Sequence, residues 1–258
     1  MTLDHQNFET LAVTVNEKIC SIQFNRPEAG NSINAQLVEE FDAVTRYCAD
    51  AQNGISILLL EGNSEAFSSG GDFNAAASGS AAPDAGQLYD IWHRMTSGPF
   101  VSISLVEGRV NAGGIGFIAA SDVVLAGPSA TFGLSEMLFG LFPACVLPFL
   151  IRRVGRQKAH YMTLMTKTID VQEALSWHLV DQTSDNTALM LRQHLTRLQR
   201  LDKQAITTYK SYMNGIHGND LLATRKPATD ANQSMFSDAK IQANIKRYVD
   251  ELKFPWEA

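Results

Sequence analysis

The sequence predicts an α/β fold that is followed by a helical C-terminal segment. Three observations lead to this prediction: an alternating apolar pattern near the start, short continuous apolar runs in the middle, and helical apolar periodicity from about residue 187 onward. Strands that alternate with helices early in a chain and give way to helices later are typical of α/β proteins.

The first elements follow from apolar spacing. "LAVTVNEKICSIQF" (11–24) alternates on both sides of polar residues 16–18 and predicts a β-hairpin. A helix is expected next, because the following apolar residues share one helical face: Leu37, Val38, Phe41, Val44 and Tyr47. Buried strands are expected in "ISILLL" (55–60), "VSISLVEG" (101–108) and "DVVLAG" (122–127).

Later elements carry clearer boundary signals. A helix is expected from Leu147, because Pro148 is compatible with its first turn. Asp170 and Glu173 resemble a capping box with Asp at the cap. Long helices follow, with a break at "NGIHGND" (214–220). The Ala/Ser/Gly-rich residues 74–86 are predicted to form a surface loop, which could also serve as a lid.

Composition excludes several classes of protein. The chain has 258 residues, of which 45% are hydrophobic, and a formal charge of -6. This negative charge disfavours general binding of nucleic acids, although a local basic patch stays possible. No apolar run approaches the length of about 18 residues that spans a membrane, and the first residues do not resemble a signal peptide. A cytoplasmic protein is expected, with Cys20, Cys48 and Cys145 as buried structural thiols.

Two glycine sites are the first candidates for chemistry, "FSSGGDF" (67–73) and "AGGIG" (112–116), and each follows an expected buried strand. Glycine lets a backbone approach a ligand closely and leaves amide N–H groups unobstructed. Neither site matches GxxxxGK[ST] or GxGxxG, so neither is a phosphate or dinucleotide loop. Each alone could be a tight turn or a catalytic loop.

Five motifs in this order together resemble the enoyl-CoA hydratase, or crotonase, superfamily: "NRPEAGNSIN", "AFSSGGDF", "VEGRVNAGGIGFIAASDVVLAG", "ATFGLSEMLFGLFPA" and "RRVGRQKA". The resemblance implies a crotonase-like fold of repeated ββα units. It implies a core with the active site over residues 1–186 and a helical segment over 187–258 that supports oligomerisation and covers the pocket. A homotrimer or a dimer of trimers is expected.

The resemblance also implies the catalytic groups. The backbone N–H groups of Gly71 and Gly113 would hold a thioester oxygen as it becomes an enolate, and losing one such donor typically costs roughly 3 to 4 kcal/mol. Glu136, in "FGLSE", would handle the proton at the α-carbon. Ordinary hydratases of the family have a second glutamate, and its position here is Gly116.

Other residues near these motifs are candidate substrate contacts. Ser69 and Asp72 lie within the first glycine site, and Gly114 lies within the second. A second set could help the departing oxygen or a distal carboxylate, although a structural role is favoured for each member: Asn111, Tyr89, His93 and Arg109. No metal site is expected.

Further stretches resemble one branch of the superfamily, the dehydratase of the β-branching cassette of bacterial polyketide synthases: "LYDIWHRMTSGP", "LFGLFPACVLPFLIRRVGRQKAHYMTLMTK" and "FPWE". The resemblance implies dehydration of 3-hydroxy-3-methylglutaryl-acyl carrier protein to 3-methylglutaconyl-acyl carrier protein. It implies no cofactor beyond the carrier's phosphopantetheine, with CoA esters as surrogates, and no nucleic-acid or membrane partner.

Alternatives stay open at this level. The basic run at Arg152, Arg153, Arg156 and Lys158 could be a solvated helix face, or could dock the acidic carrier or its phosphate. With one glutamate, the chain could instead be the cassette's 3-methylglutaconyl decarboxylase. A non-catalytic crotonase-fold binding protein is the third interpretation.

Overall fold

The computed structural model describes residues 8–78, 83–216 and 221–257. The strands are β1 (Leu11–Asn16), β2 (Ile19–Phe24), β3 (Ile57–Glu61), β4 (Ala66–Ser68), β5 (Val101–Val106), β6 (Arg109–Asn111), β7 (Val123–Ala126), β8 (Thr131–Gly133), β9 (Ile169–Asp170) and β10 (Gln182–Thr183). The helices are α1 (Ala35–Ala49), α2 (Phe73–Ala77), α3 (Ala85–Ser97), α4 (Gly114–Ala120), α5 (Leu147–Met165), α6 (Val171–Ser176), α7 (Thr187–Leu198), α8 (Lys203–Ile216), α9 (Leu221–Phe236) and α10 (Ala239–Glu251). Two short 3-10 helices are η2 (Pro27–Ala29) and η3 (Glu136–Phe139).

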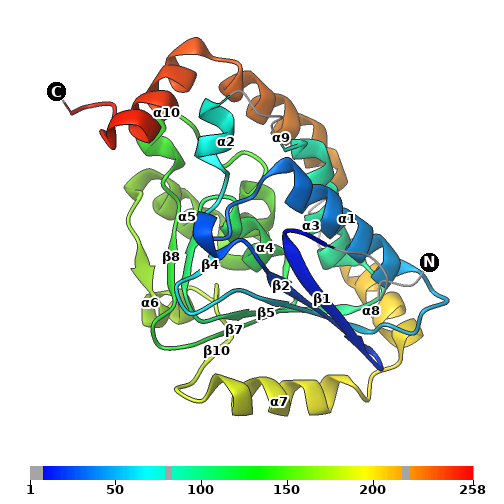
Figure 1. The fold of residues 1–258 in the computed structure, drawn as a ribbon. Helices are drawn as coiled ribbons and strands as arrows, with labels where there is room; N and C mark the ends of the chain where they lie inside the picture. Colours follow the sequence, from blue (N-terminus) through cyan, green and yellow to red (C-terminus); the bar gives the residue numbers. More distant parts are fainter. Residues whose placement is uncertain (1–7, 79–82, 217–220, 258) are drawn as a thin grey trace.

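The strands form two sheets (Figure 1). The larger sheet has the order β1-β2-β3-β5-β7-β10 and is parallel except for the β1–β2 hairpin. The smaller sheet has the order β4-β6-β8-β9. Three times in succession, a strand of the larger sheet is followed by a strand of the smaller sheet and then by helix. The repeated ββα units expected of a crotonase-like fold are thus confirmed.

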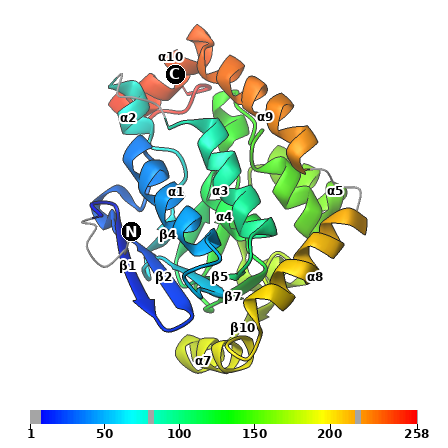
Figure 2. The ribbon, with the colours of Figure 1, turned by 90° about the vertical axis from the view of Figure 1, so that its right-hand side faces the viewer.

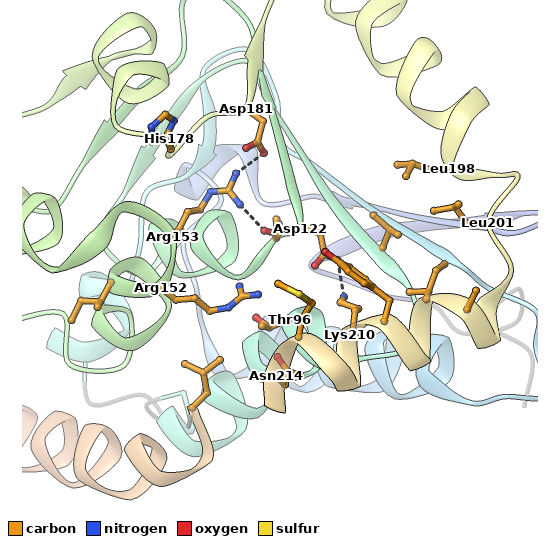
Figure 3. Close-up of a pocket in the computed structure, with 18 residues that line it drawn as sticks. Thr96, Asp122, Arg152, Arg153, His178, Asp181, Leu198, Leu201, Lys210 and Asn214 are labelled. Carbon is orange, nitrogen blue, oxygen red and sulfur yellow. Dashed lines mark hydrogen bonds and ion pairs between the residues drawn. The ribbon is translucent and has the colours of Figure 1, made fainter. Parts of the chain in front are cut away.

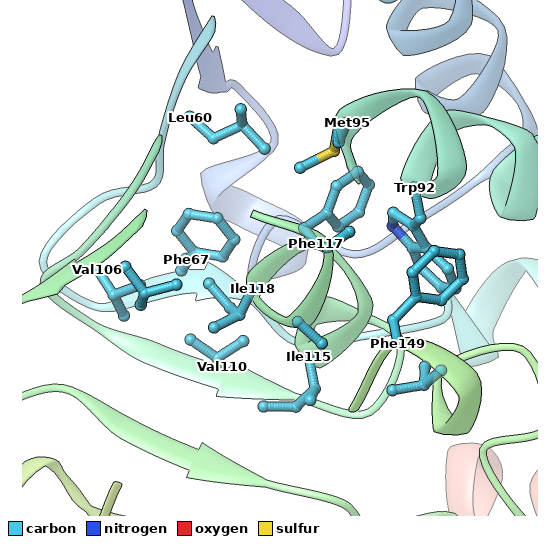
Figure 4. Packing of buried hydrophobic residues seen from close by; sticks show 14 of the residues in the cluster. Leu60, Phe67, Trp92, Met95, Val106, Val110, Ile115, Phe117, Ile118 and Phe149 are labelled. Atoms are coloured by element: carbon cyan, nitrogen blue, oxygen red, sulfur yellow. The ribbon is translucent and has the colours of Figure 1, made fainter. Parts of the chain in front are cut away.

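Helix α4 lies at the centre of the molecule, and all seven of its residues are buried. Aromatic side chains pack around it: the ring centroids of Phe117 and Phe41 lie 4.9 Å apart, and those of Phe117 and Trp92 lie 5.7 Å apart (Figure 4). Helices α1 and α3 lie side by side above the larger sheet, while α7 covers its opposite face (Figures 1 and 2). The residues that lead into α4 therefore join an apolar interior.

Most elements expected from the sequence are present. The hairpin, the helix after it, the three buried strands and the Asp170 cap, which accepts a hydrogen bond from the Glu173 amide at 2.8 Å, are confirmed. The expected break at 214–220 includes residues 217–220, which lie outside the described residues, and α8 and α9 flank them. The three cysteines are free and buried.

The loop expected over 74–86 is partly wrong. Residues 79–82 lie outside the described part, but Phe73–Ala77 is helical, because alanine favours helix and the Asp72 carboxylate accepts a hydrogen bond from the Ala75 amide at 3.0 Å. Asp84 in turn caps α3. The short strands of the smaller sheet were not expected, since segments of two or three residues carry no measurable periodicity.

The helical segment after residue 187 packs onto the rest of the chain. Helix α9 contacts α3, and α10 lies over η3 and α2, where Phe139, Leu141 and Ile245 form a buried cluster (Figure 1). The Asn244 side chain donates a hydrogen bond to the Phe139 carbonyl at 3.1 Å. The division at 186/187 and the oligomerising role stay predictions. None of the helices in the described ranges is long and apolar enough to span a bilayer.

A buried cation ties α8 to the larger sheet. Lys210 Nζ donates to the carbonyls of Met95 and Phe100 at 3.0 and 2.8 Å and to Asp122 Oδ2 at 2.7 Å. Burial lowers the pKa of Lys210, and the nearby Asp122 carboxylate opposes this effect. The side chain is 6% exposed, so loss of Asp122 would leave its charge uncompensated.

We therefore expect Asp122→Ala to lower the free energy of unfolding by about 3 to 5 kcal/mol, as measured by urea denaturation at pH 7. Asp230→Ala is the matched control, because it breaks the exposed Lys226–Asp230 pair in α9 and should cost less than about 0.5 kcal/mol. Similar decreases in the free energy of unfolding of both variants would contradict a larger contribution from the buried Lys210–Asp122 pair.

Candidate active site

The two glycine sites of the sequence are in direct contact. Gly70 has φ +92°, and a Cβ atom built on it would lie 2.5 Å from the Cβ of Ala112. Only glycine meets both requirements, the positive φ and the close approach. Ile33 binds the first loop through its amide, which donates to the Gly70 carbonyl at 2.8 Å, and through its carbonyl, which accepts from the Asp72 amide at 3.1 Å.

This pairing leaves the amide of Gly71 unused. Within the described part of the chain, neither the Gly71 N–H nor the Gly113 N–H donates a hydrogen bond. The two residues are neighbours, since a Cβ atom built on Gly113 would lie 3.9 Å from the Gly71 nitrogen. A Cβ built on Gly71 would meet nothing within 4 Å, so space is open there for a ligand. Two adjacent free N–H groups can stabilise a developing oxyanion.

An ion pair between Arg26 and Asp72 holds the first glycine loop in place. Arg26 donates to Asp72 Oδ2 at 2.9 Å and to the Ser32 carbonyl at 2.6 Å, while the Ser32 hydroxyl donates to the same Oδ2 at 3.2 Å. Burial by itself would raise the pKa of Asp72, but hydrogen bonds from Ala75 and Arg26 lower it overall. Asp72 thus holds the loop, and its predicted contact with substrate stays a prediction.

Glu136 begins the 3-10 turn that follows β8. Its Oε2 atom is enclosed and has no hydrogen-bond partner among the described residues. Burial raises the pKa of this carboxyl group to about 7. The turn is joined to the second glycine site, because Asn111 Nδ2 donates to Ser135 Oγ at 2.9 Å and the Ala112 amide donates to the Gly133 carbonyl at 3.0 Å. A carboxyl group with such a pKa can exchange a proton near neutral pH.

The place of the missing acid is filled. A Cβ atom built on Gly116 would lie 2.2, 2.5 and 2.6 Å from the Cζ2, Cη2 and Cε2 atoms of Trp92. No side chain of any kind fits at position 116 while the indole stands there. The chain therefore lacks the second glutamate and also the room for it.

The remaining predicted residues lie in different surroundings. Gly114 begins α4 close to Ser68, since a Cβ atom built on it would lie 2.8 Å from the Ser68 carbonyl oxygen. The Ser69 hydroxyl donates to the Ala29 carbonyl at 3.4 Å. The Tyr89 hydroxyl is buried and donates to the Leu221 carbonyl at 2.6 Å. His93 Nδ1 lies 3.4 Å from Ser97 Oγ. Arg109 is exposed at the start of β6, and its Nη2 atom lies 3.9 Å from where a Cβ of Gly30 would be. Their roles toward substrate stay predictions.

The basic run is divided by the fold. Arg153 is bound within the chain, to the carbonyls of Ser121 and Leu179 and to Asp181 Oδ2 at 2.5 Å. Lys158 Nζ lies 4.6 Å from the centre of the Trp177 ring. Arg156 is exposed. The helix itself breaks at Gly155, which has φ 77° and ψ 160°, so the run does not form one continuous cationic face.

A separate cavity of about 950 Å³ lies between α5, α7 and α8 (Figure 3). Its wall includes Arg152, the Arg153–Asp181 pair and the Lys210–Asp122 pair. None of the residues assigned above to oxyanion binding or proton transfer lines it. This cavity is therefore separate from the candidate active site.

Two residues of the site were missed at the level of sequence. Arg26 lies inside the motif "NRPEAGNSIN", and the arginine in that motif was an available signal. Trp92 lies in "LYDIWHRMTSGP" with no pattern that connects it to the glycines. The sequence offered one indirect signal for Trp92, namely that Gly116 is a glycine on the buried face of an apolar helix.

The family model described as enoyl-CoA hydratase/isomerase matches residues 14–258. The chain belongs to this family, the crotonase superfamily. It is 46% identical over 260 residues to the bacillaene synthase dehydratase PksH of Bacillus subtilis (strain 168), with 99% of both chains covered. It is 32% identical over 206 residues to the 2,3-dehydroadipyl-CoA hydratase of Escherichia coli (strain K12), with 76% of this chain and 79% of the relative covered.

Solved structures agree with this membership. The crystal structure of the polyketide biosynthesis enoyl-CoA hydratase PksH from Bacillus subtilis matches with a TM-score of 0.92 at 46% identity, over 96% of this chain and 100% of that chain. An enoyl-CoA hydratase from Mycobacterium avium subsp. paratuberculosis, at 21% identity, shares the fold with a TM-score of 0.85. The chain is accordingly an enzyme of the hydro-lyase class, which disfavours the non-catalytic interpretation.

The contact between Gly116 and Trp92 can be tested by stability. Gly116→Ala should lower the free energy of unfolding by about 1 to 3 kcal/mol, because its new methyl group overlaps the indole. Gly215→Ala is the matched control: this glycine is also helical but has nothing within 4 Å, so alanine should stabilise the protein by up to about 1 kcal/mol. A stabilised Gly116→Ala protein would contradict the overlap.

The burial of Glu136 predicts a pH-dependent stability. Its pKa rises from an ordinary value of 4.5 to about 7 on folding, so the folded state holds the proton more tightly than the unfolded chain. The protonated Glu136 carboxyl group therefore contributes its full stabilisation of the folded state below about pH 4.5, and this stabilisation is lost as the pH rises through about 7. Glu136→Gln, which cannot ionise, should match the original protein at pH 4 and exceed its unfolding free energy by about 3 kcal/mol at pH 8.5.

Urea denaturation at both pH values measures this difference. Glu39→Gln, on the exposed side of α1, controls for loss of a surface carboxylate. An advantage of Glu136→Gln that does not change with pH would contradict a raised pKa.

Proposed function

We propose that this enzyme removes water from a 3-hydroxy-3-methylglutaryl group on an acyl carrier protein, giving the 3-methylglutaconyl thioester, in polyketide biosynthesis. The observation that carries this proposal is the combination of two free amides at Gly71 and Gly113 with the Glu136 carboxyl group, whose Oε2 atom is enclosed and has no partner among the described residues. The 46% identity to a dehydratase named for bacillaene synthase, over almost the whole of both chains, supports the pathway.

The chemistry follows from these groups. The Glu136 carboxylate takes the proton from the α-carbon, and the electron pair moves onto the thioester oxygen. That oxygen becomes an enolate held by the two amide N–H groups, which act most strongly in a site without water. As the enolate collapses, the bond between C3 and its oxygen breaks, and the carboxylic acid returns the proton to the departing hydroxide. One carboxyl group thus serves as base and then as acid.

The raised pKa of Glu136 suits both removal of the α-proton and its return to the leaving hydroxide. A carboxyl group with a pKa of about 7 is a stronger base than an ordinary glutamate and still ionises at physiological pH. Its Oε2 atom has no competing partner, so it is free to receive a proton from substrate. The contact of a distal substrate carboxylate with Arg109 stays part of the proposal.

Further parts of the proposal concern partners. We propose that the substrate arrives on a phosphopantetheine arm, that CoA esters act as surrogates, that no other cofactor or metal takes part, and that the enzyme works in the cytoplasm. Exposed apolar side chains on α5 and α8, such as Ile151, Tyr209 and Tyr212, support association of copies into a homotrimer or a dimer of trimers. Carrier docking draws no support from Arg153 and Lys158, which are engaged within the chain.

The sister decarboxylation is the second candidate, because a single acid is also enough for it. Loss of carbon dioxide from 3-methylglutaconyl carrier needs the two amides and one proton donor, but no group to accompany a leaving hydroxide. The pKa of Glu136 alone would permit either reaction.

The deciding experiment follows the intact mass of 3-hydroxy-3-methylglutaryl carrier protein and, separately, of 3-methylglutaconyl carrier protein during incubation with the enzyme. We expect loss of water from the first and no change in the second. The rate constant kcat/KM should rise with pH through about 7, because proton removal needs the ionised carboxylate. Glu136→Gln should lower kcat by roughly 100- to 10,000-fold, while Glu39→Gln should not change it.

Loss of carbon dioxide from the second carrier, without loss of water from the first, would replace the dehydratase by the decarboxylase. Full activity of Glu136→Gln would remove Glu136 from the mechanism.

A further inference from the structure

Buried polar atoms without partners are rare in this fold. Among the described residues, three side-chain atoms are enclosed and lack a hydrogen bond: Ser56 Oγ, Trp92 Nε1 and Glu136 Oε2. Most buried polar groups in proteins are hydrogen-bonded, and an exception often marks a place where a ligand supplies the partner. Glu136 has such an explanation in the proposed reaction, and Trp92 requires one of its own.

Trp92 is held rigidly. It belongs to α3 and is 1% exposed. Phe117 and Phe149 pack against it at right angles or nearly so, with ring centroids 5.7 and 5.8 Å from its own (Figure 4). Those contacts are apolar, so the N–H group gains no hydrogen bond from them, and an N–H left without a partner in such surroundings destabilises the free enzyme.

The indole ring borders the place of the missing acid. Gly116 follows Gly113 by three residues and therefore shares its face of α4, one helical turn further on. The atoms Cζ2, Cη2 and Cε2 of Trp92 stand 2.2, 2.5 and 2.6 Å from where a Cβ of residue 116 would be. Cε2 is bonded to Nε1 in every indole, so the N–H group is one bond away from the ring edge that occupies this place.

We propose that Trp92 Nε1–H takes over one task of the absent acid and donates a hydrogen bond to the 3-hydroxyl oxygen of the substrate. The inference rests on the proposed dehydration and assigns a further catalytic residue to it. Trp92 keeps its proton throughout. The C3–oxygen bond breaks, the proton that Glu136 took from the α-carbon joins the leaving oxygen as water, and the indole N–H stabilises the negative charge that develops there.

The choice of donor has a chemical consequence. Indole N–H only donates and does not ionise in the working pH range of a protein. All proton transfer in the cycle is therefore confined to Glu136, whereas two carboxyl groups would interact and titrate as a pair. The pH dependence of kcat should show a single ionisation on its acid side.

Trp92→Phe tests this role, because phenylalanine keeps an aromatic ring and removes the N–H. Loss of a donor to developing charge should lower kcat for water loss by about 10- to 100-fold. A second substrate separates this role from packing: a saturated 3-methylglutaryl carrier has no hydroxyl group, so the enzyme can only exchange its α-hydrogens with deuterium from solvent. Trp92→Phe should retain this exchange within about twofold of the original rate, while Glu136→Gln should lose it.

Phe149→Leu is the matched control. It disturbs the packing on Trp92 but keeps the N–H, so water loss and exchange should change together and by only a few-fold. Water loss in Trp92→Phe at the original rate would overturn the role of Trp92 alone, as would equal slowing of both reactions. Absence of water loss with the original enzyme would overturn the proposed function, and the role of Trp92 would fall with it.

A measurement on the unchanged protein keeps the inference testable if Trp92→Phe does not fold. The indole N–H resonance of Trp92 can be assigned from Trp177→Phe and Trp256→Phe variants. A non-reacting carrier analogue with fluorine in place of both α-hydrogens should shift this resonance downfield, and the same analogue without the 3-hydroxyl should not. Equal shifts with both analogues would overturn the proposal.

Discussion

The complete burial of α4 is the constraint on which the site depends. The helix is buried along its whole length, while its N-terminus borders open space beside Gly71, so the first amide N–H groups there can be satisfied by a ligand. Here the Gly113 N–H has no partner in the described part of the chain, and its neighbour across the gap, Gly71, is in the same condition. The helix dipole adds a positive potential at the same end. An oxygen that gains negative charge is the group best suited to this position.

The same enclosure determines which side chains can take part. A carboxylate is destabilised in such surroundings, and burial raises the pKa of the Glu136 carboxyl group to about 7. A second carboxylate beside it would make ionisation of either still harder. Trp92 avoids this conflict, because its large apolar ring fills space that the Gly116 side leaves open and its single polar atom carries no charge. The loss of one acid and the presence of the indole are therefore one structural change.

The sequence could predict those parts of the site that lie within short motifs. Gly71, Gly113 and Glu136 were found in this way, because each lies in a run whose order along the chain is itself informative, and the hairpin and long helices followed from periodicity. The Arg26–Asp72 pair and the Trp92–Gly116 contact could not be predicted, since each joins segments separated by more than 20 residues. Asp72 shows the limit clearly: its place in the motif suggested a contact with substrate, and only the fold reveals that a guanidinium group already binds it. Strands such as β6 and β8 exist because their neighbours pair with them, not because of a pattern of their own.

The position of α10 has a consequence for how the enzyme is made. This helix follows every other element in the chain, yet it packs over the turn that begins with Glu136, through Ile241, Ile245 and Tyr248. A ribosome releases α10 after the glycine loops and the large sheet have left the exit tunnel. Until α10 docks, the apolar side chains of this turn, Phe139 among them, lack their cover. The turn that carries Glu136 therefore gains this cover late in synthesis, after the sheets that hold the rest of the site.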